Sequence, residues 1–320
     1  MKIVVKISLI VAAALVILGT LIFTIAMSLN DWDFRKLGNG GLEQKTYEET
    51  GEFNDISISA LYEDVIFLPY DGDGCKVVCD ERDKVSHSVV VADGTLKIQS
   101  QDDRAWYEKL FNFGEEKMTV YLPNVEYNAL TLTGNTGDIV IPKDFSFESI
   151  DLELSTGDIE CFASAAGGVK IALSTGDVDI ENVSVSSLDI TTSTGEISVD
   201  SVNCDGEVKI KVSTGDVELS NLTCKSLVSS GNTGDIELDN VIVNDSINIE
   251  RSTGDVEFNR CDAAQISVTT DTGDVSGSLL SNKIFITSTD TGRISVPNSS
   301  SGGKCEITTS TGNIVFEILS

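Results

Sequence analysis

The feature that most constrains the fold is a four-residue unit, Ser-Thr-Gly-Asp at residues 155–158, whose variants recur ten times between residue 135 and the C-terminus. The glycines of the ten Thr-Gly pairs are separated by 19 or 20 residues in every interval. They are Gly137, Gly157, Gly176, Gly195, Gly215, Gly234, Gly254, Gly273, Gly292 and Gly312. A period of about 20 residues is typical of solenoids, in which each repeat stacks on its neighbours. The repeat therefore predicts the fold of the chain but does not by itself indicate an activity.

Apolar residues alternate with polar ones on both sides of each glycine. The position seven residues before the glycine is apolar in all ten copies, and the position two residues after it is always isoleucine or valine. This alternation is typical of two short strands with inward side chains. Because the inward set changes phase at the glycine, the chain must bend there, and glycine adopts a positive φ at little cost. The same argument predicts that the threonine before each glycine faces the core and the acidic residue after it faces water.

A third side of each coil is indicated by apolar residues seven positions after several glycines. They are Val183, Val202, Leu222, Val241, Cys261 and Leu280. We therefore expect an all-β fold, a right-handed parallel β-solenoid of about ten coils with 19–20 residues and two or three strands each. At a strand spacing of roughly 4.8 Å, the solenoid is about 45 Å long. An antiparallel meander is the alternative, because 20 residues also accommodate a hairpin.

An apolar segment lies at the N-terminus, over residues 7–29, after Lys2 and Lys6. A helix of this length crosses the roughly 30 Å of hydrocarbon in a bilayer. The basic flank predicts a cytoplasmic N-terminus, with Trp32 and Phe34 at the outer interface. A cleaved signal peptide is the alternative. We predict a single pass through the bacterial cell membrane with an extracytoplasmic C-terminal domain.

The rest of the chain divides by composition. We expect residues 1–29 to be the cytoplasmic N-terminus and transmembrane anchor, 30–52 a stalk, 53–128 a β-rich cap and 129–320 the solenoid repeats. The cap contains short alternating strands and Asp-Gly turns at 71/72, 73/74 and 93/94. It is expected to cover the first coil, because an open terminal strand invites pairing with other chains. Trp106 and Phe111 are expected in its core, with a ligand patch as the alternative.

The composition excludes several function classes. A net charge of −29 argues against nucleic acid and favours cations as charged ligands. His87 is the only histidine, and the seven cysteines show no disulfide-framework or zinc-site spacing. There is no Ser-His-Asp arrangement and no phosphate loop. Glycan-cleaving β-helix enzymes need basic residues in a cleft, and the repeats contain only three arginines, Arg251, Arg260 and Arg293. We predict a protein that is not an enzyme and has no cofactor.

Acidic residues follow eight consecutive glycines. Seven are aspartates that form a candidate cation-binding strip, since hard cations prefer carboxylate oxygens. They are Asp138, Asp158, Asp177, Asp216, Asp235, Asp255 and Asp274, with Glu196 in the remaining coil. The competing interpretation, which we favour, is that aspartate suits a turn because it bonds nearby backbone.

The cysteines of the repeats are expected to be structural. Cys161, Cys261 and Cys305 occupy inward positions and are interpreted as buried thiols. Cys204 and Cys224 both lie nine residues after their glycines, so adjacent coils bring them within range of a disulfide. Whether they form one is left open by the sequence.

Three features together resemble a known family. They are the apolar segment followed by Trp32-Asp33-Phe34, the strand that ends Val120-Tyr121-Leu122-Pro123, and the Thr-Gly-Asp-Ile or Thr-Gly-Asp-Val repeats. They are similar to those of the bacterial β-strand-repeat family of unknown function that is labelled "putative adhesin". The resemblance implies an envelope protein with a β-solenoid outside the membrane. Some similar proteins look like modulators of envelope-stress signalling.

These observations favour a membrane-anchored extracytoplasmic binding or scaffolding module, adhesin-like in character. An accessory or regulator of envelope-stress signalling is the alternative, and a glycan-active β-helix enzyme comes third. The expected partners are the membrane, through the N-terminal helix, and a protein or glycan ligand. The C-terminal edge of the solenoid is also expected to permit end-to-end self-association.

Overall fold

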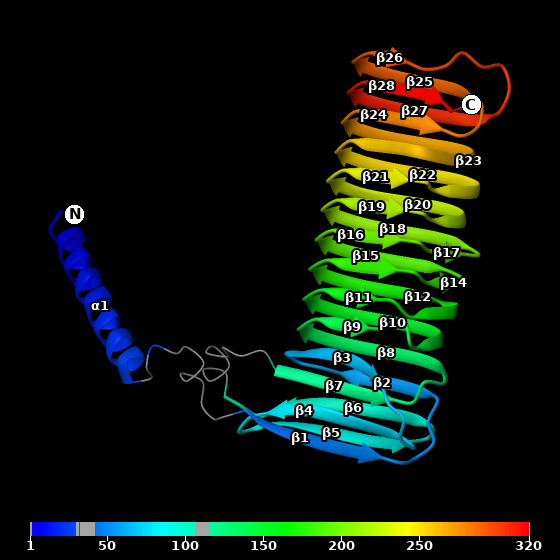
Figure 1. The fold of residues 1–320 in the computed structure, drawn as a ribbon. Coiled ribbons are helices and arrows are strands. Elements are labelled where there is room, and N and C mark those ends of the chain that lie inside the picture. The colour runs from blue at the N-terminus through cyan, green and yellow to red at the C-terminus, as the bar shows by residue number, and fades with distance from the viewer. Residues whose placement is uncertain (1, 30–31, 33–41, 106–115, 320) are drawn as a thin grey trace.

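The computed structural model describes residues 2–29, 32, 42–105 and 116–319 (Figure 1). Helix α1 (Lys2–Leu29) precedes an elongated stack of strands. The N-terminal strands are β1 (Glu43–Glu49), β2 (Asp55–Ser59), β3 (Glu63–Pro69), β4 (Cys75–Glu81), β5 (Val85–Ala92), β6 (Thr95–Asp102) and β7 (Glu116–Leu122). The repeats contain β8 (Glu126–Thr136), β9 (Ile139–Ile141), β10 (Ser146–Thr156), β11 (Ile159–Cys161), β12 (Ser164–Thr175), β13 (Val178–Glu181), β14 (Ser184–Val185), β15 (Leu188–Thr194), β16 (Ile197–Asp200), β17 (Asn203–Cys204), β18 (Glu207–Thr214), β19 (Val217–Ser220), β20 (Thr223–Thr233), β21 (Ile236–Asp239), β22 (Ile242–Thr253), β23 (Val256–Thr272), β24 (Val275–Leu279), β25 (Lys283–Thr291), β26 (Ile294–Ser295), β27 (Gly303–Thr311) and β28 (Ile314–Ile318).

The repeats form a parallel β-solenoid, as the period predicted. Strands that precede the glycines pair in parallel from β8 through β10, β12, β15, β18, β20 and β22 to the second half of β23, and we call this the long-strand sheet. Strands that follow the glycines pair in parallel from β9 through β11, β13, β16, β19 and β21 to the first half of β23, and we call this the short-strand sheet. Because consecutive coils pair in parallel, the antiparallel meander is wrong. The about ten turns and the N-terminal apolar helix are confirmed.

The third side is also present. Strands β14 and β17 and the first residues of β20 and β22 pair along it. Its residues Val183, Val202, Leu222, Val241 and Cys261 are buried, whereas Leu280 is 37% exposed and its neighbour Leu279 is buried instead. A second corner precedes this side, where Asn182, Ser201, Asn221, Asn240 and Arg260 all have φ between 51 and 58°. Asparagine tolerates this left-handed conformation better than most residues. The 20-residue coil that ends at Gly254 contains its extra residue between Val243 and Ser246 of β22, where the register with β20 shifts between Cys224 and Ser226.

The Thr-Gly corner combines positive φ with close packing. All ten glycines have φ between 123 and 159°. A Cβ atom on Gly195 would lie 1.8 Å from the carbonyl oxygen of Gly176, and similar overlaps recur along the glycine column. Glycine is therefore required twice over at these positions, once by its own backbone angle and once by the neighbouring coil.

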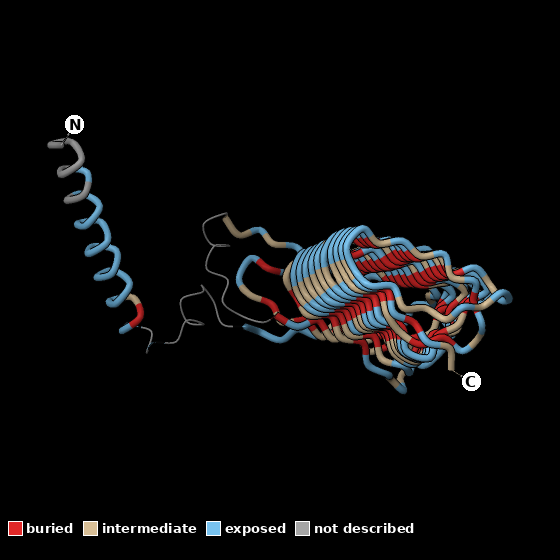
Figure 2. Tube along the Cα trace, turned by 90° about the horizontal axis from the view of Figure 1, so that it is seen from above, coloured by how far each residue is buried: buried red, intermediate tan, exposed pale blue. Residues whose placement is uncertain are grey.

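The predicted inward threonine ladder is wrong. The threonine before each of the ten glycines is exposed, including Thr156, Thr194 and Thr253. The inward positions are seven, five and three residues before the glycine, as in Ile150, Leu152 and Leu154, and then two and four after it. The corner thus spans four outward residues, because the chain that rounds the bend has no core beneath it. Buried and exposed positions consequently form continuous stripes along the stack (Figure 2).

The N-terminal end differs from the expected boundaries. Strands β2 and β3 pair in parallel with β8 and β9, so the parallel stack begins at Asp55 rather than at residue 129. Strands β6 and β7 lie on their other side, and β1, β4 and β5 add antiparallel strands that cover the end. Residues 43–49, which were expected in the stalk, form β1.

The core is aliphatic in its middle and aromatic near both ends. Tyr127 stacks on Phe53 and Phe147, with ring centroids 6.0 and 5.7 Å apart. At the other end the ring centroid of Phe316 lies 5.7 Å from the ring centroids of both Phe258 and Phe285. Because neighbouring coils are only about 4.8 Å apart, a side chain that repeats in every coil must fit that spacing along the stack, and valine, isoleucine and leucine do so.

Candidate functional site

The acidic residues after the glycines form a hydrogen-bonded ladder, which we call the acidic row. The Oδ1 atom of each aspartate accepts the backbone N–H of the residue at the same position in the next coil. The N–H of Asp158 bonds to Asp138 at 2.9 Å, that of Asp177 to Asp158 at 2.8 Å, and that of Asp235 to Asp216 at 2.7 Å. Each carboxylate therefore satisfies a backbone donor that rounds the corner of its neighbour.

The ladder extends beyond the eight coils that the sequence indicated. Asp64 accepts the N–H of Asp138 at 3.1 Å, so the row begins in the cap. At the other end Asp274 accepts the N–H of Asn313 at 2.7 Å, and Asn313 accepts that of Arg293 at 3.0 Å. The backbone and side-chain N–H groups of Asn313 lower the pKa of Asp274. Sequence spacing missed Asp64, because no Thr-Gly pair precedes it.

Glu196 interrupts the row. Its own N–H bonds to Asp177 at 2.7 Å, but its longer side chain does not accept the N–H of Asp216 in the next coil. Glu196 lies instead beside Asp158, Asp177 and Asp179 in a shallow groove of about 290 Å³. Burial and the neighbouring carboxylates raise the pKa values of Glu196 and Asp179. These like charges make the groove strongly acidic.

The cation strip has no further structural support in the described part of the chain. In that part, no three acidic, histidine or cysteine side chains converge as they would around a bound metal ion. The Oδ1 atoms of all seven candidate aspartates accept a backbone N–H from a following coil. The strip stays a prediction, and the ladder gives the same residues a structural role.

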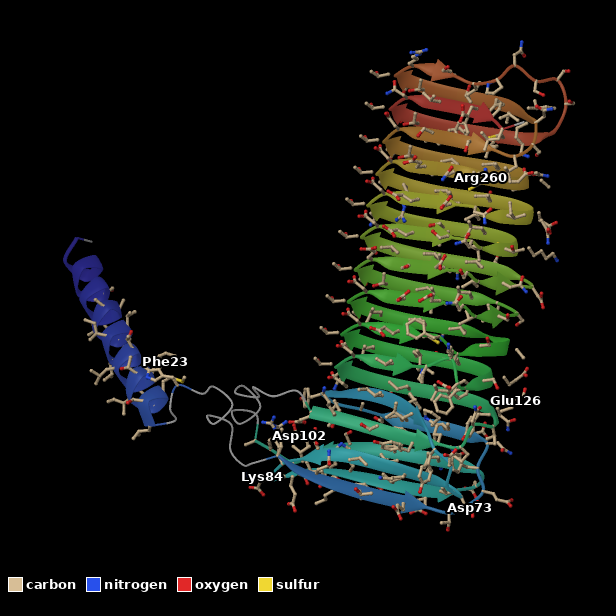
Figure 3. The ribbon with its side chains drawn as sticks, viewed as in Figure 1. Phe23, Asp73, Lys84, Asp102, Glu126 and Arg260 are labelled. Atoms are coloured by element: carbon tan, nitrogen blue, oxygen red, sulfur yellow. The ribbon has the colours of Figure 1, made fainter. Side chains whose placement is uncertain are left out.

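The outward side of the short-strand sheet is the most acidic surface, and we call it the acidic face. It contains the acidic row and the acidic residues three positions after the glycines, which are Glu160, Asp179, Glu218, Glu237 and Glu257. On the long-strand sheet, by contrast, Lys170 pairs with Asp151 and Lys209 with Asp189 across neighbouring coils. Figure 3 shows oxygen-ended side chains projecting along one edge of the stack from coil to coil. The acidic face is thus a long surface of like charge.

A second cluster, which sequence reasoning missed, surrounds His87 in the cap. The side chain of His87 is buried between two carboxylates, with Nε2 3.1 Å from Glu63 and Nδ1 3.2 Å from Glu81. Glu81 also accepts from the Tyr47 hydroxyl at 2.5 Å and contacts Lys45 at 2.6 Å. The four strands β1, β3, β4 and β5 supply these residues. The alternation of apolar residues places His87 at an inward position of β5. It does not identify Glu63 and Glu81 as its partners, because they lie 24 and 6 residues away on other strands.

The hydrogen bonds of the His87 cluster favour a protonated histidine beside an ionised Glu63. Burial opposes the charge on His87, but hydrogen bonds to Cys79 and Glu63 outweigh it and raise the pKa of His87 to about 10. Burial likewise opposes ionisation of Glu63, but bonds from His87, Leu61 and Tyr62 lower its pKa to about 2. Burial raises the pKa of the Cys79 thiol. A protonated histidine does not act as a general base for that thiol, and its bonds to Glu63 and Glu81 join strands β3, β4 and β5.

A surface pocket of about 440 Å³ lies next to this cluster, lined by β1 and by the turn between β4 and β5. Lys45, Glu81, Arg82 and Lys84 contribute both signs of charge to it. Deeper in the cap, Arg82 lies 2.7 Å from the buried carboxylate of Glu116. Burial raises the pKa of Glu116 despite this partner.

The seven cysteines are all free and buried. Cys204 and Cys224 follow the paired residues Asn203 and Thr223, so they are neighbours in adjacent coils, but both are thiols in this structure. Burial raises the pKa values of Cys161 and Cys305 to about 12, as expected for thiols that pack as small hydrophobic groups. Trp106 and Phe111, the predicted core or ligand patch of the cap, lie outside the described residues, as does Phe34.

The helix α1 contains a stretch, Val11–Leu29, of mean hydropathy 2.4 that is long enough to cross a membrane. A retained anchor and a signal sequence both have this property.

Comparison with known proteins gives matches of family and of fold. A family model described as Toastrack DUF4097 matches residues 53–317. A crystal structure described as a "putative adhesin" from Bacteroides fragilis is 16% identical, with 88% of this chain and 99% of that chain covered and a TM-score of 0.44. Another of the same description from Parabacteroides distasonis is 15% identical, with 76% and 98% covered and a TM-score of 0.48. No curated protein matches the chain.

Proposed function

The chain belongs to the Toastrack DUF4097 family, and on that premise we propose that it is an adhesin-like binding or scaffolding module of the bacterial cell envelope. In this proposal α1 holds the chain at the membrane in a single pass, and the solenoid lies on the extracytoplasmic side. The solenoid presents a protein or glycan ligand with a rigid surface, and its C-terminal end permits self-association.

The acidic face is the observation that carries the proposal. It repeats negative charge at the coil spacing, on a scaffold in which the acidic row satisfies the backbone N–H at this corner in the neighbouring coils apart from that of Asp216. A single exposed ion pair contributes only about 0–1 kcal/mol. A row of such pairs against a partner with positive charges along its length gives affinity and steering that salt weakens. The favoured ligand is therefore an extended basic surface on a protein or an amino-bearing glycan.

The test compares two triple variants of the full chain in detergent or nanodiscs. The first is Glu218→Gln, Glu237→Gln and Glu257→Gln on the acidic face. The matched control is Glu153→Gln, Glu207→Gln and Glu250→Gln on the long-strand sheet, where the residues are equally exposed and the change in net charge is the same. Binding to cells and to protein and glycan arrays is measured at two salt concentrations.

We expect the acidic-face variant to lose binding and most of its salt dependence, and the control to keep both. Equal loss in both variants would show that only net charge matters and would overturn the assignment of the face. Absence of any ligand, together with co-purification of a membrane kinase, would favour the signalling accessory instead. Turnover of a glycan would favour an enzyme.

A further inference from the structure

The order of coils at the C-terminal end departs from the order of the sequence. Strands β27 and β28 are the last in the chain, yet they do not form the outermost coil. β27 pairs with β23 on one side and β25 on the other, and β28 pairs with β24 and β26 (Figure 1). The chain therefore leaves a gap of one coil after β24, forms the outer coil β25–β26, and then returns to fill the gap.

The inserted coil makes a full set of contacts with both neighbours. The N–H of Gly273 bonds to Thr311 on one side, and the N–H of Gly312 bonds to Thr291 on the other. Its side chains Cys305, Ile307 and Ile314 are completely buried. Without this coil, two sheets on each side of the gap would have unpaired edges.

The segment that leads into the inserted coil is suited to act as a hinge. Seven residues, 296–302, separate β26 from β27, and they form neither helix nor strand. The sequence Val-Pro-Asn-Ser-Ser-Ser-Gly contains the residue types of turns and flexible linkers. Fully extended, seven residues span roughly 23 Å, or several coil spacings.

The outer coil exposes apolar surface that the other coils do not. Ile294 is 43% exposed, whereas the residue two positions after each of the other nine glycines is at most 1% exposed. Ile284 and Ile286 lie on the outward side of β25 and are 41% and 49% exposed. In the described structure β25 and β26 each have one paired neighbour, so their outer edges are open. An open apolar edge of this kind is a site for pairing with another chain.

We propose that two copies of this chain exchange their C-terminal coils, so that residues 303–318 of each copy fill the gap in the other. The exchanged coil makes the same contacts that it makes within one chain, and only the hinge changes conformation, which is why such exchange is a low-cost route to dimers. The two outer ends meet in this dimer, so the open edges of β25 and β26 and the side chain of Ile294 become covered. The inference extends the self-association in the proposed function and does not depend on the acidic face.

The experiment uses paired cysteine variants on two full-length copies with different tags, expressed together in one cell. Ser276 of β24 and Val315 of β28 are partners in the register and lie at the surface. One copy carries Ser276→Cys and the other Val315→Cys, so neither can form this disulfide within itself. The control pair is Glu257→Cys and Ser276→Cys, which are also register partners but lie on β23 and β24, outside the exchanged coil. A single chain with both Ser276→Cys and Val315→Cys reports whether the geometry permits the bond.

We expect mild oxidation to give a disulfide-linked dimer that carries both tags for the Ser276→Cys and Val315→Cys pair and not for the control pair. If the single-chain double variant forms its disulfide but the two-copy pair stays unlinked, the exchange does not occur. Equal linkage in both pairs reflects contact between copies without exchange and also overturns the inference. Ligand binding is measured separately, so a failed exchange leaves the proposed binding function intact.

Discussion

Replacement of Glu196 by aspartate should repair the one gap in the acidic row. In all seven aspartates of the row after the glycines, the carboxylate accepts a backbone N–H from the next coil at 2.7–2.9 Å. The side chain of Glu196 is one methylene longer, and the N–H of Asp216 donates no such bond to it. Glu196→Asp restores the length that fits.

The expected gain follows from the energy of one such bond. A hydrogen bond to a charged group contributes about 1.5–3 kcal/mol, and solvent exposure at the corner reduces this to about 1 kcal/mol. A free energy of 1 kcal/mol corresponds to roughly a fivefold change in an opening equilibrium. Hydrogen exchange of the Asp216 amide should therefore slow about fivefold in Glu196→Asp.

The reverse change is the matched control. Asp177→Glu lengthens the acceptor of the Glu196 N–H, which is now bonded at 2.7 Å, and should speed exchange of that amide by a similar factor. Asp177→Asn keeps an oxygen acceptor and should have a smaller effect. If Glu196→Asp leaves exchange at Asp216 unchanged while Asp177→Glu speeds exchange at residue 196, side-chain length is not what interrupts the row.

Four further predictions concern the core, the corner, pH and cations. Arg251 is 4% exposed and its Nε and Nη2 atoms have no partner, so Arg251→Leu should raise the free energy of unfolding by about 1–3 kcal/mol in urea titrations. Gly195→Ala should lower thermal stability far more than Gly94→Ala, since both have positive φ but only the first meets another coil; equal losses would refute the packing argument. His87 has a raised pKa, so its contribution to stability is complete below about pH 6.5 and is lost as the pH rises through about 10; the contribution of Glu63, whose pKa is lowered, is complete above about pH 4.5 and is lost towards about pH 2. His87→Gln should flatten a plot of Tm against pH between about pH 6.5 and 9, below the range in which the buried cysteines, with their raised pKa values, also titrate. Millimolar calcium should leave Tm unchanged, and an increase would revive the cation strip.

The solenoid can be predicted from the sequence because it follows from a short residue pattern that recurs in every repeat. The 19–20-residue period, the inward isoleucine or valine after each glycine and the glycine corner are all properties of one repeat that recur ten times. The orientation of the threonines was not predictable in the same way. Two-residue alternation predicts that Thr156 and its equivalents face the core, but the bend has no core beneath it, and these side chains face water.

The sequence alone determined that coils stack, which side chains line the core and where each coil bends, because these depend on residues within about 20 positions of one another. Tertiary structure alone decided which coil lies beside which and what the charged residues contact. The spacing is compatible with coils stacked in chain order, yet β28 lies between β24 and β26, because coils built from the same repeat present similar edges for pairing. His87 likewise meets Glu63 and Glu81 only because strands separated by turns fold onto one another. The repeated sequence therefore predicts the structure of each coil, whereas packing at the ends of the stack determines the order of the coils.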